Sequence, residues 1–413
     1  MHSHLRTVLF SLLVIVAGPV SALGQNNRYT ERSFIPSPSV RAMGDAGVAL
    51  LGKDRPFFYN PAQLPSISSY FSILGVQAAA SPNIRKQINF YNRRVQPAIE
   101  SNFDLEPDAL EELYQDTYEL GRQPLRGTGA VVLPSFVYSK NGIGVGGGLF
   151  AKTALNYRTK GAGLGVPSIY LLSRTDVMAL LSLGVDLKTI GLPGVSVGVT
   201  GTRTRRLLAF ENKPLDTFSA DEAAILLQGN TYQVDVGGLY TPSWWMLPGT
   251  LTLGGAVYDL FGGQYDYSFE GSPRIPFLEG IVAESATVDT EAVRQEVERA
   301  RRRFRLERSF RMGVAYRISS LSVLDGVGVA VDYQGYGHDQ QHPLARLHLG
   351  GRARLNDTFT VRGGLSAGYP TGGLGIRLGV LRLDYAVHAF EEGRVPGQLR
   401  TYVHTARLTL RIE

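Results

Sequence analysis

The chain has 413 residues, no cysteine and a formal net charge of +6, and 44% of its residues are hydrophobic. The absence of cysteine excludes a disulfide framework and a lipid anchor on a cysteine. The charge is modest for this length and no DNA- or RNA-binding module is visible, so we expect no nucleic-acid partner. The 48 glycines, 20 tyrosines and 18 phenylalanines favour a sheet closed on itself, in which glycine allows bends and aromatic side chains lie at interfaces.

Residues 1–24 are predicted to be a secretory signal peptide. A basic start over residues 2–6 precedes a largely apolar stretch, 8–18, and a small-residue cleavage site before Gln25. The apolar stretch is too short to cross a bilayer as a helix. The alternative, an N-terminal membrane anchor, lacks the charged flank that would follow it. The mature chain is therefore expected to be exported.

Residues 25–67 are predicted to form a plug in the mouth of a barrel. The small residues between Gly44 and Ala49 let the chain thread against a wall, and glycine allows unusual backbone angles. Pro61 fixes its own φ and biases Asn60 towards an extended backbone, so the Asn-Pro-Ala sequence makes a rigid turn. Such a segment can block a lumen. One alternative stays open: Asn60 and Pro61 only end a short helix before the first strand.

Residues 68–413 are predicted to form an all-β fold, a transmembrane antiparallel β-barrel. Between Leu344 and Leu355, apolar residues alternate with His348, Arg352 and Arg354. In an outer-membrane barrel the apolar face meets lipid and the polar face lines the lumen, whereas in a soluble sandwich the polar face meets water. Fourteen strands are expected at 68–80, 126–139, 142–157, 174–187, 194–209, 230–241, 249–262, 308–319, 325–336, 343–355, 358–367, 372–378, 381–390 and 399–412.

Loop lengths separate these two architectures. Each connection after an odd-numbered strand is expected to be longer than its even-numbered neighbours, as in a barrel with short periplasmic turns and long outward loops. The even strand number places both termini in the periplasm. Helical patterns occur in the outer loops over residues 107–120, 221–227 and 291–306. The arginines of the last helix could face lipopolysaccharide phosphates, the alternative being a solvated face with i,i+4 pairs.

Two motifs suggest enzymatic chemistry, but we expect the protein not to be an enzyme. Residues 142–147 match GxGxxG, yet a strand follows them, whereas a dinucleotide site needs a helix there. Residues 364–368 match the GxSxG nucleophile elbow but lead into a loop and another strand. A hydrolase embedded in the barrel would need Ser366 within hydrogen-bond reach of a histidine such as His348 or His388. We expect no catalytic residue and no cofactor.

Other polar and aromatic clusters have simple explanations in a barrel. His338, Asp339 and His342 share one loop and could bind a metal, but we expect a solvated loop and no metal. Trp244 and Trp245 suit the girdle at a membrane interface. Several arginines are expected to line the lumen, where they could bind a fatty-acid carboxylate or pack against the plug and neighbouring acids: Arg346, Arg352, Arg354, Arg362, Arg377 and Arg382.

Residues 39–64 resemble the amino-terminal signature of the FadL-type outer-membrane proteins, in which a small-residue run is followed by an acidic residue, an aromatic pair and Asn-Pro-Ala. The matching positions are Arg41, Met43, Gly44, Ala46, Gly47, Val48, Ala49, Asp54, Phe58, Tyr59, Asn60, Pro61, Ala62 and Leu64. Residues 362–387 look like the closing strands of the same superfamily. There are two departures: the chain ends in Glu413 rather than an aromatic residue, and Asp45 stands where a second glycine is often seen.

The resemblance implies a bacterial outer-membrane location and two alternative functions. The transporter branch implies passive uptake of hydrophobic small molecules such as fatty acids, with the plug as a hatch. The PorV-like branch of type IX secretion implies a scaffold that binds secreted proteins or partner barrels. Outer-membrane lipid and lipopolysaccharide are expected partners in both cases. The positions expected to bind ligand or gate the lumen are Gly44, Gly47, Phe58, Asn60, Pro61 and Ala62.

Overall fold

The computed structural model describes residues 33–50, 52, 56–101, 103–121, 125–160, 166–215, 226–243, 248–269, 290–304, 306, 308–319, 324–336, 343–391 and 400–413. Four earlier expectations lie outside these residues. They concern the signal peptide 1–24, most of the helix 221–227, the tryptophans 244 and 245, and the loop residues 338, 339 and 342. Among the described residues, no helix is both long enough and apolar enough to cross a membrane.

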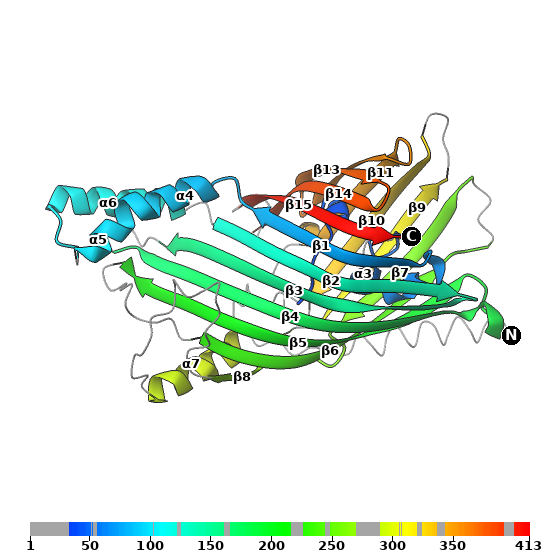
Figure 1. Cartoon of the computed structure of the whole chain (residues 1–413), viewed down its shortest axis with the longest axis horizontal. Coiled ribbons are helices and arrows are strands. Elements are labelled where there is room, and N and C mark those ends of the chain that lie inside the picture. The colour runs from blue at the N-terminus through cyan, green and yellow to red at the C-terminus, as the bar shows by residue number, and fades with distance from the viewer. Residues whose placement is uncertain are drawn as a thin grey trace.

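Fourteen strands close into an antiparallel barrel, as the alternating pattern predicted (Figure 1). The barrel strands are β1 (Tyr70–Ala80), β2 (Leu125–Lys140), β3 (Ile143–Lys160), β4 (Ser168–Asp186), β5 (Val195–Pro214), β6 (Leu226–Tyr240), β7 (Thr250–Tyr258), β9 (Ser309–Ile318), β10 (Gly326–Tyr336), β11 (Leu347–Arg354), β12 (Phe359–Ser366), β13 (Tyr369–Leu378), β14 (Leu381–Glu391) and β15 (Arg400–Ile412). Each barrel strand pairs with the next one along the chain, and β1 pairs with β15 to close the ring.

Over most of the barrel, alternation along the strands sends polar and small side chains inward and apolar side chains outward. On β9, Met312 and Val314 are exposed, whereas Arg311 is buried. The pairing register aligns the apolar positions of neighbouring strands. Val314, for example, lies opposite Val331, which lies opposite Leu349. The outer wall therefore carries a continuous apolar surface.

The described structure corrects several expected boundaries. Strands β3 to β6 are longer than expected. The β3–β4 connection, residues 161–167, is therefore no longer than the β4–β5 connection. Residues 226 and 227, which were expected to end a helix, begin β6. The connection at 367–368 is also short, so loop length does not sort by parity everywhere. The expected strand 249–262 stops at Tyr258, and a separate short strand, β8 (Asp266–Phe269), pairs with the far part of β6. These differences arise because cross-strand pairing extends strands through sequence that lacks a clear alternation.

The longer helices outside the N-terminal segment gather at one end of the barrel (Figure 1). An arm between β1 and β2 consists of α4 (Ile84–Phe90), the π-helical turn η2 (Tyr91–Val95), α5 (Gln96–Glu100) and α6 (Pro107–Gly121). The expected helix 107–120 is thus confirmed as α6, while α4 and α5 were not expected. The expected helix 291–306 is α7 (Thr290–Arg303), whose Ala300 is buried. Short 3-10 turns, η3 (Leu187–Ile190) and η5 (Pro343–Arg346), precede β5 and β11.

The N-terminal segment lies inside the barrel. It contains α2 (Pro38–Arg41), α3 (Pro56–Tyr59) and the 3-10 helix η1 (Pro61–Ser66), and nearly all of its described residues up to Leu64 are buried. Asn60 caps η1, since its side chain accepts a hydrogen bond from the Ala62 N–H. Asn60 and Pro61 therefore separate α3 from η1, which is the position that a helix-ending role requires. We call residues 33–66 the plug.

Candidate functional site

The plug fits against the wall because glycines face it from many strands. A side chain at Gly198 would place its Cβ 2.5 Å from the Pro61 carbonyl carbon and 2.6 Å from the Ala62 nitrogen. Wall glycines at which an added Cβ would lie closer than 3.0 Å to a plug atom include Gly144, Gly184, Gly198, Gly237, Gly254, Gly313, Gly350 and Gly364, which we call the glycine belt. They lie side by side across the sheet, with pairs such as Gly184 opposite Gly198 and Gly350 opposite Gly364. The belt lets plug backbone pack directly on wall backbone.

Asp332 of β10 holds the plug on one side of the barrel. Its Oδ2 accepts hydrogen bonds from the N–H groups of Gly47 at 2.7 Å and Val48 at 2.9 Å. The Asp332 side chain is fully buried and lies 3.8 Å from the Arg311 guanidinium. A buried carboxylate that accepts two backbone N–H groups fixes the position of that backbone strongly.

Asn60 holds the plug near β6 and β7. Its Nδ2 donates to the carbonyl of Val48 at 2.9 Å within the plug and to Gly238 at 3.1 Å and Gly255 at 3.3 Å on the wall. The Tyr258 hydroxyl donates to the Tyr59 carbonyl at 2.7 Å in the same region. Asn60 is fully buried, so all of these bonds are shielded from water.

Contacts with Arg311 explain how the chain tolerates Asp45 at a position where the signature often has glycine. Gly44 and Asp45 both have positive φ, 65° and 69°, so a side chain at position 45 needs compensation. Arg311 supplies it through a 2.5 Å bond to the Asp45 carbonyl and a 3.1 Å ion pair to the carboxylate, while Arg41 lies 3.4 Å away. Burial alone would raise the pKa of Asp45, but the positive charges of Arg41 and Arg311 outweigh burial and hold that pKa well below its usual range.

A second ionic cluster fixes the start of the plug. Arg206 on β5 binds both carboxylate oxygens of Asp176 on β4, at 2.5 and 2.9 Å, and its guanidinium lies 3.9 Å from the Tyr265 ring centroid. Ser33 donates to Asp176 at 3.1 Å and accepts from Arg206 at 2.8 Å. Above this cluster, Phe304, which directly follows α7, packs on other buried apolar side chains.

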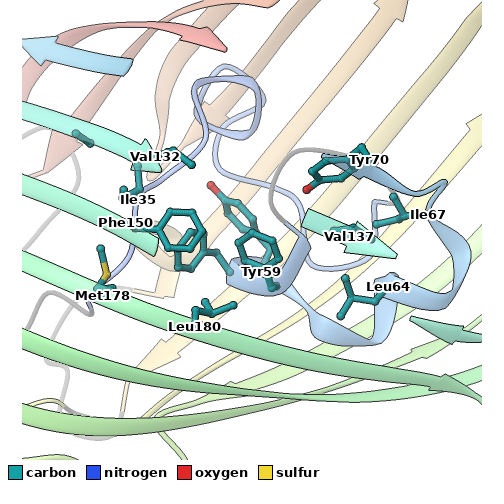
Figure 2. Packing of buried hydrophobic residues seen from close by; sticks show 13 residues of the cluster. Ile35, Tyr59, Leu64, Ile67, Tyr70, Val132, Val137, Phe150, Met178 and Leu180 are labelled. Atoms are coloured by element: carbon teal, nitrogen blue, oxygen red, sulfur yellow. The ribbon is translucent and has the colours of Figure 1, made fainter. Parts of the chain in front are cut away.

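The lumen also contains an apolar lining (Figure 2). Phe57 and Phe58 of α3 pack against Phe150 of β3, with ring centroids 5.7 and 5.1 Å apart. Met178 and Leu180, both on β4, complete this side of the contact. Inward positions of a barrel are ordinarily polar, so apolar wall residues facing the lumen set this sector apart.

The structure brings all six predicted plug positions into this region. Gly44 donates its N–H to the Thr371 hydroxyl at 2.9 Å, and Gly47 binds Asp332. Phe58 lies in the apolar lining, and Asn60 is fully buried with its wall contacts. Pro61 and Ala62 lie against the belt at Gly198.

The predicted lumen arginines do not form one site. Arg362 is buried and lies 3.3 Å from Asp384, while half-buried Arg377 and Arg382 lie 3.7 and 3.9 Å from Glu413. Arg352 is half-buried near Gly52 of the plug, Arg354 is exposed at a turn, and Arg346 belongs to η5 rather than to β11. The packing interpretation therefore accounts for Arg362, because Asp384 neutralises it.

The glycine belt and the roles of the buried aspartates were not predicted from the sequence. The available signal was glycine at inward positions of expected strands, such as Gly184 and Gly198, but pairing between those positions is a tertiary property. The partners of Asp332 were likewise hidden, because they lie 284 and 285 residues away.

Ser366 and His348 meet the distance condition for a hydrolase but not its protonation condition. The Ser366 hydroxyl lies 3.3 Å from His348 Nδ1. The same nitrogen lies 2.7 Å from the Gly44 carbonyl, which can only accept a hydrogen bond, so Nδ1 carries a proton. A protonated Nδ1 cannot take the serine proton, so this pair lacks a general base.

We expect a fluorophosphonate ester, which labels activated serines, to leave Ser366 unmodified. Mass spectrometry of the treated barrel would check this, with a Ser366→Ala variant as the blank. Stoichiometric labelling that disappears in Ser366→Ala would show that the serine is activated after all.

No protein-family model and no curated protein matches the sequence. Several solved structures have a similar fold, including the toluene transporter TbuX of Ralstonia pickettii, with 14% identity, a TM-score of 0.44, and coverage of 91% of this chain and 97% of that chain. The toluene transporter TodX of Pseudomonas putida is 11% identical, with a TM-score of 0.46. A FadL homologue of Pseudomonas aeruginosa is 13% identical, with a TM-score of 0.41. Each of these two alignments covers 91% of this chain and 97% of the other chain. The last of these is described as a homologue of FadL, the type of protein that residues 39–64 resemble. At these identities and TM-scores the likeness is too distant to assign a function.

Proposed function

We propose that the protein is an outer-membrane barrel for the passive uptake of hydrophobic small molecules, with the plug as its gate. The observation that carries this proposal is the apolar lining of the lumen, where Phe150, Met178 and Leu180 of the wall face α3 of the plug. Water-filled pores are lined by polar side chains, whereas a path for hydrophobic molecules requires apolar ones.

The outer surface supports the proposed membrane location. Large apolar side chains such as Val76, Leu181 and Val329 are 49, 65 and 49% exposed on the outward face. Apolar exposure of this extent suits contact with lipid rather than water. The helical arm and α7 would then face outward near lipopolysaccharide, and the opposite end, where β15 finishes, would face the periplasm (Figure 1).

Movement of α3 is the gating step that the contacts favour. The rings of Phe57 and Phe58 occupy the apolar lining, and a hydrophobic ligand such as a fatty acid could replace them there without exposing the wall to water. Asn60 directly follows α3, and its side chain donates hydrogen bonds both to the plug and to the wall. We therefore place the hinge of the gate at Asn60.

Asn60→Ala is expected to loosen the plug and to increase uptake of hydrophobic compounds. The variant leaves the Val48, Gly238 and Gly255 carbonyls without their shared donor, which costs about 1–3 kcal/mol for buried groups. Lipid extraction and mass spectrometry of the purified barrel, together with uptake of labelled toluene and fatty acid by cells, would measure the effect. Asn230→Ala, at an exposed position of β6, is the matched control.

Wild-type barrel that carries no hydrophobic ligand, with no uptake in either variant, would contradict the transport proposal. Co-purification of another protein in place of a ligand would point to the second candidate.

The second candidate is a PorV-like scaffold, which the helical arm favours. The acidic side chains of Asp108, Glu111 and Glu119 are exposed on α6, at the end of the barrel where a secreted protein would arrive (Figure 1). Reversing these charges to lysine would remove a partner held by the arm and leave uptake of hydrophobic compounds unchanged.

A further inference from the structure

The helical arm between β1 and β2 is an αα-hairpin that projects from the end of the barrel. The chain runs out along α4, η2 and α5 and returns along α6, and these helices reach past the ends of the neighbouring strands (Figure 1). Gln87 Nε2 donates to the Leu120 carbonyl at 3.3 Å, while Arg94, later in the chain, lies 3.0 Å from the earlier Glu112. The two halves of the arm are therefore antiparallel. Most of their described residues are exposed.

The two halves of the arm carry opposite charge. Residues 84–100 contain four basic side chains and one acidic one, whereas α6 contains five acidic side chains and no basic one. Arg94 joins the halves, since it lies 3.0 Å from Glu112 and 3.5 Å from Asp116. Further charges are exposed on each half: Arg85, Lys86 and Arg93 on the first half, and Asp108, Glu111 and Glu119 on α6. The arm thus presents one basic and one acidic helical surface.

Each half also exposes a large apolar side chain among its charges. Ile88 is 50% exposed and lies three residues from Arg85, so the two share one face of α4. Tyr118 is 40% exposed and lies seven residues from Glu111, on the side of α6 opposite to buried Leu113. Apolar side chains surrounded by charged ones are typical of surfaces that pack on another protein.

We propose that the arm is a dimerisation element that binds the arm of a second copy of this chain. When two such hairpins are related by a two-fold axis, the basic half of each arm meets the acidic half of the other, so the same contact forms twice. The four helices then make a bundle of antiparallel neighbours. The opposite charges favour a second copy over a secreted protein, because a partner of one charge would match only one half of the arm.

The membrane location proposed above permits this geometry, and the dimer assigns nothing to the lumen. Two barrels in one bilayer have parallel axes, so the two-fold axis that relates them runs along the membrane normal. The arm continues beyond the strands in the long direction of the barrel (Figure 1), so that axis can run alongside its helices. The two arms can therefore meet outside the membrane while both barrels stay upright.

The test is the mass of the purified full-length barrel in non-ionic detergent, measured by light scattering after size-exclusion chromatography. We expect two chains per particle for the wild type. Two variants each reverse one half of the arm. The acidic-arm variant combines Arg85→Glu, Lys86→Glu and Arg93→Glu. The basic-arm variant combines Asp108→Lys, Glu111→Lys and Glu119→Lys.

Each arm variant alone is expected to be monomeric, with self-association weakened at least about tenfold, because like charges then face each other at both contacts. An equimolar mixture of the two variants should form a heterodimer, since one arm is then acidic on both halves and the other is basic on both. Recovery in the mixture also shows that both variants are folded. A structural defect in either arm would not be repaired by the other.

The matched control reverses three exposed basic side chains at the opposite end of the barrel and should remain dimeric: Lys140→Glu, Lys188→Glu and Arg354→Glu. A monomeric wild type, a dimer that persists in either arm variant, or a mixture that stays monomeric would overturn the proposed dimer. A monomeric barrel with a different protein on its arm would overturn it too and would assign the arm to the scaffold. Uptake of labelled toluene by cells tests the transport proposal separately, because the arm variants leave the plug and the lumen unchanged.

Discussion

Gly198→Val is expected to force the plug away from β5 and to open the barrel. The new Cβ would lie 2.5 to 2.7 Å from three backbone atoms of Pro61 and Ala62, and all three atoms belong to the plug. Because these three nearest atoms all belong to the plug, we expect the plug to move while the strand keeps its place. Overpacking of this kind costs about 1–3 kcal/mol, and displacement of the plug relieves it. Planar-bilayer recordings should change from a closed barrel to a stable conductance.

Gly201→Val provides the matched control for this experiment. Gly201 lies three residues further along β5, and a Cβ there would meet no atom within 4 Å. The control should therefore fold and stay closed, as judged by circular dichroism and conductance. If Gly198→Val also stayed closed and kept its plug protected from protease, close packing against the glycine belt would not be what positions the plug.

Asp332→Ala is expected to release the middle of the plug without breaking the barrel. The substitution removes the carboxylate that accepts from the N–H groups of Gly47 and Val48 and that lies 3.8 Å from the Arg311 guanidinium. Removing one member of a buried ionic group costs about 3–5 kcal/mol. Since 1.4 kcal/mol is about a factor of ten, amide exchange at these two N–H groups should accelerate at least about 100-fold.

Asp325→Ala removes the same charge from an exposed position next to the start of β10 and should leave amide exchange unchanged. The two variants differ in burial and in plug contact, so the comparison isolates the anchoring role of Asp332. Unaltered exchange at Gly47 and Val48 in Asp332→Ala would mean that other contacts suffice to hold the plug.

The strands could be predicted because their signal is local. Apolar and polar residues alternate over a few positions, as in β9 and β10, and that period alone fixes which face each side chain occupies. Tyr258 marks where this reasoning fails. The strand was expected to continue to residue 262, but the chain leaves the wall after Tyr258 and returns as β8 to pair with β6, at Leu227 to Asn230.

The candidate site could be predicted only in part, for a related reason. The small residues and the Asn60-Pro61 turn are visible as neighbours in the sequence, so a plug could be foreseen. The wall partners could not, because Asp384 reaches Ser39 at 2.9 Å across 345 residues of chain.

The sequence by itself determined a closed antiparallel barrel with a compact N-terminal segment inside it, because backbone pairing and side-chain alternation follow from residue period and turn chemistry. Only the tertiary structure decided how the plug is held. The belt glycines and three aspartates that bind the plug, Asp176, Asp332 and Asp384, come together only when the sheet closes, and closure sets neighbours that sequence distance does not encode. The physical reason is that strand patterns depend on contacts within a few residues, whereas a gate depends on contacts made around the whole ring.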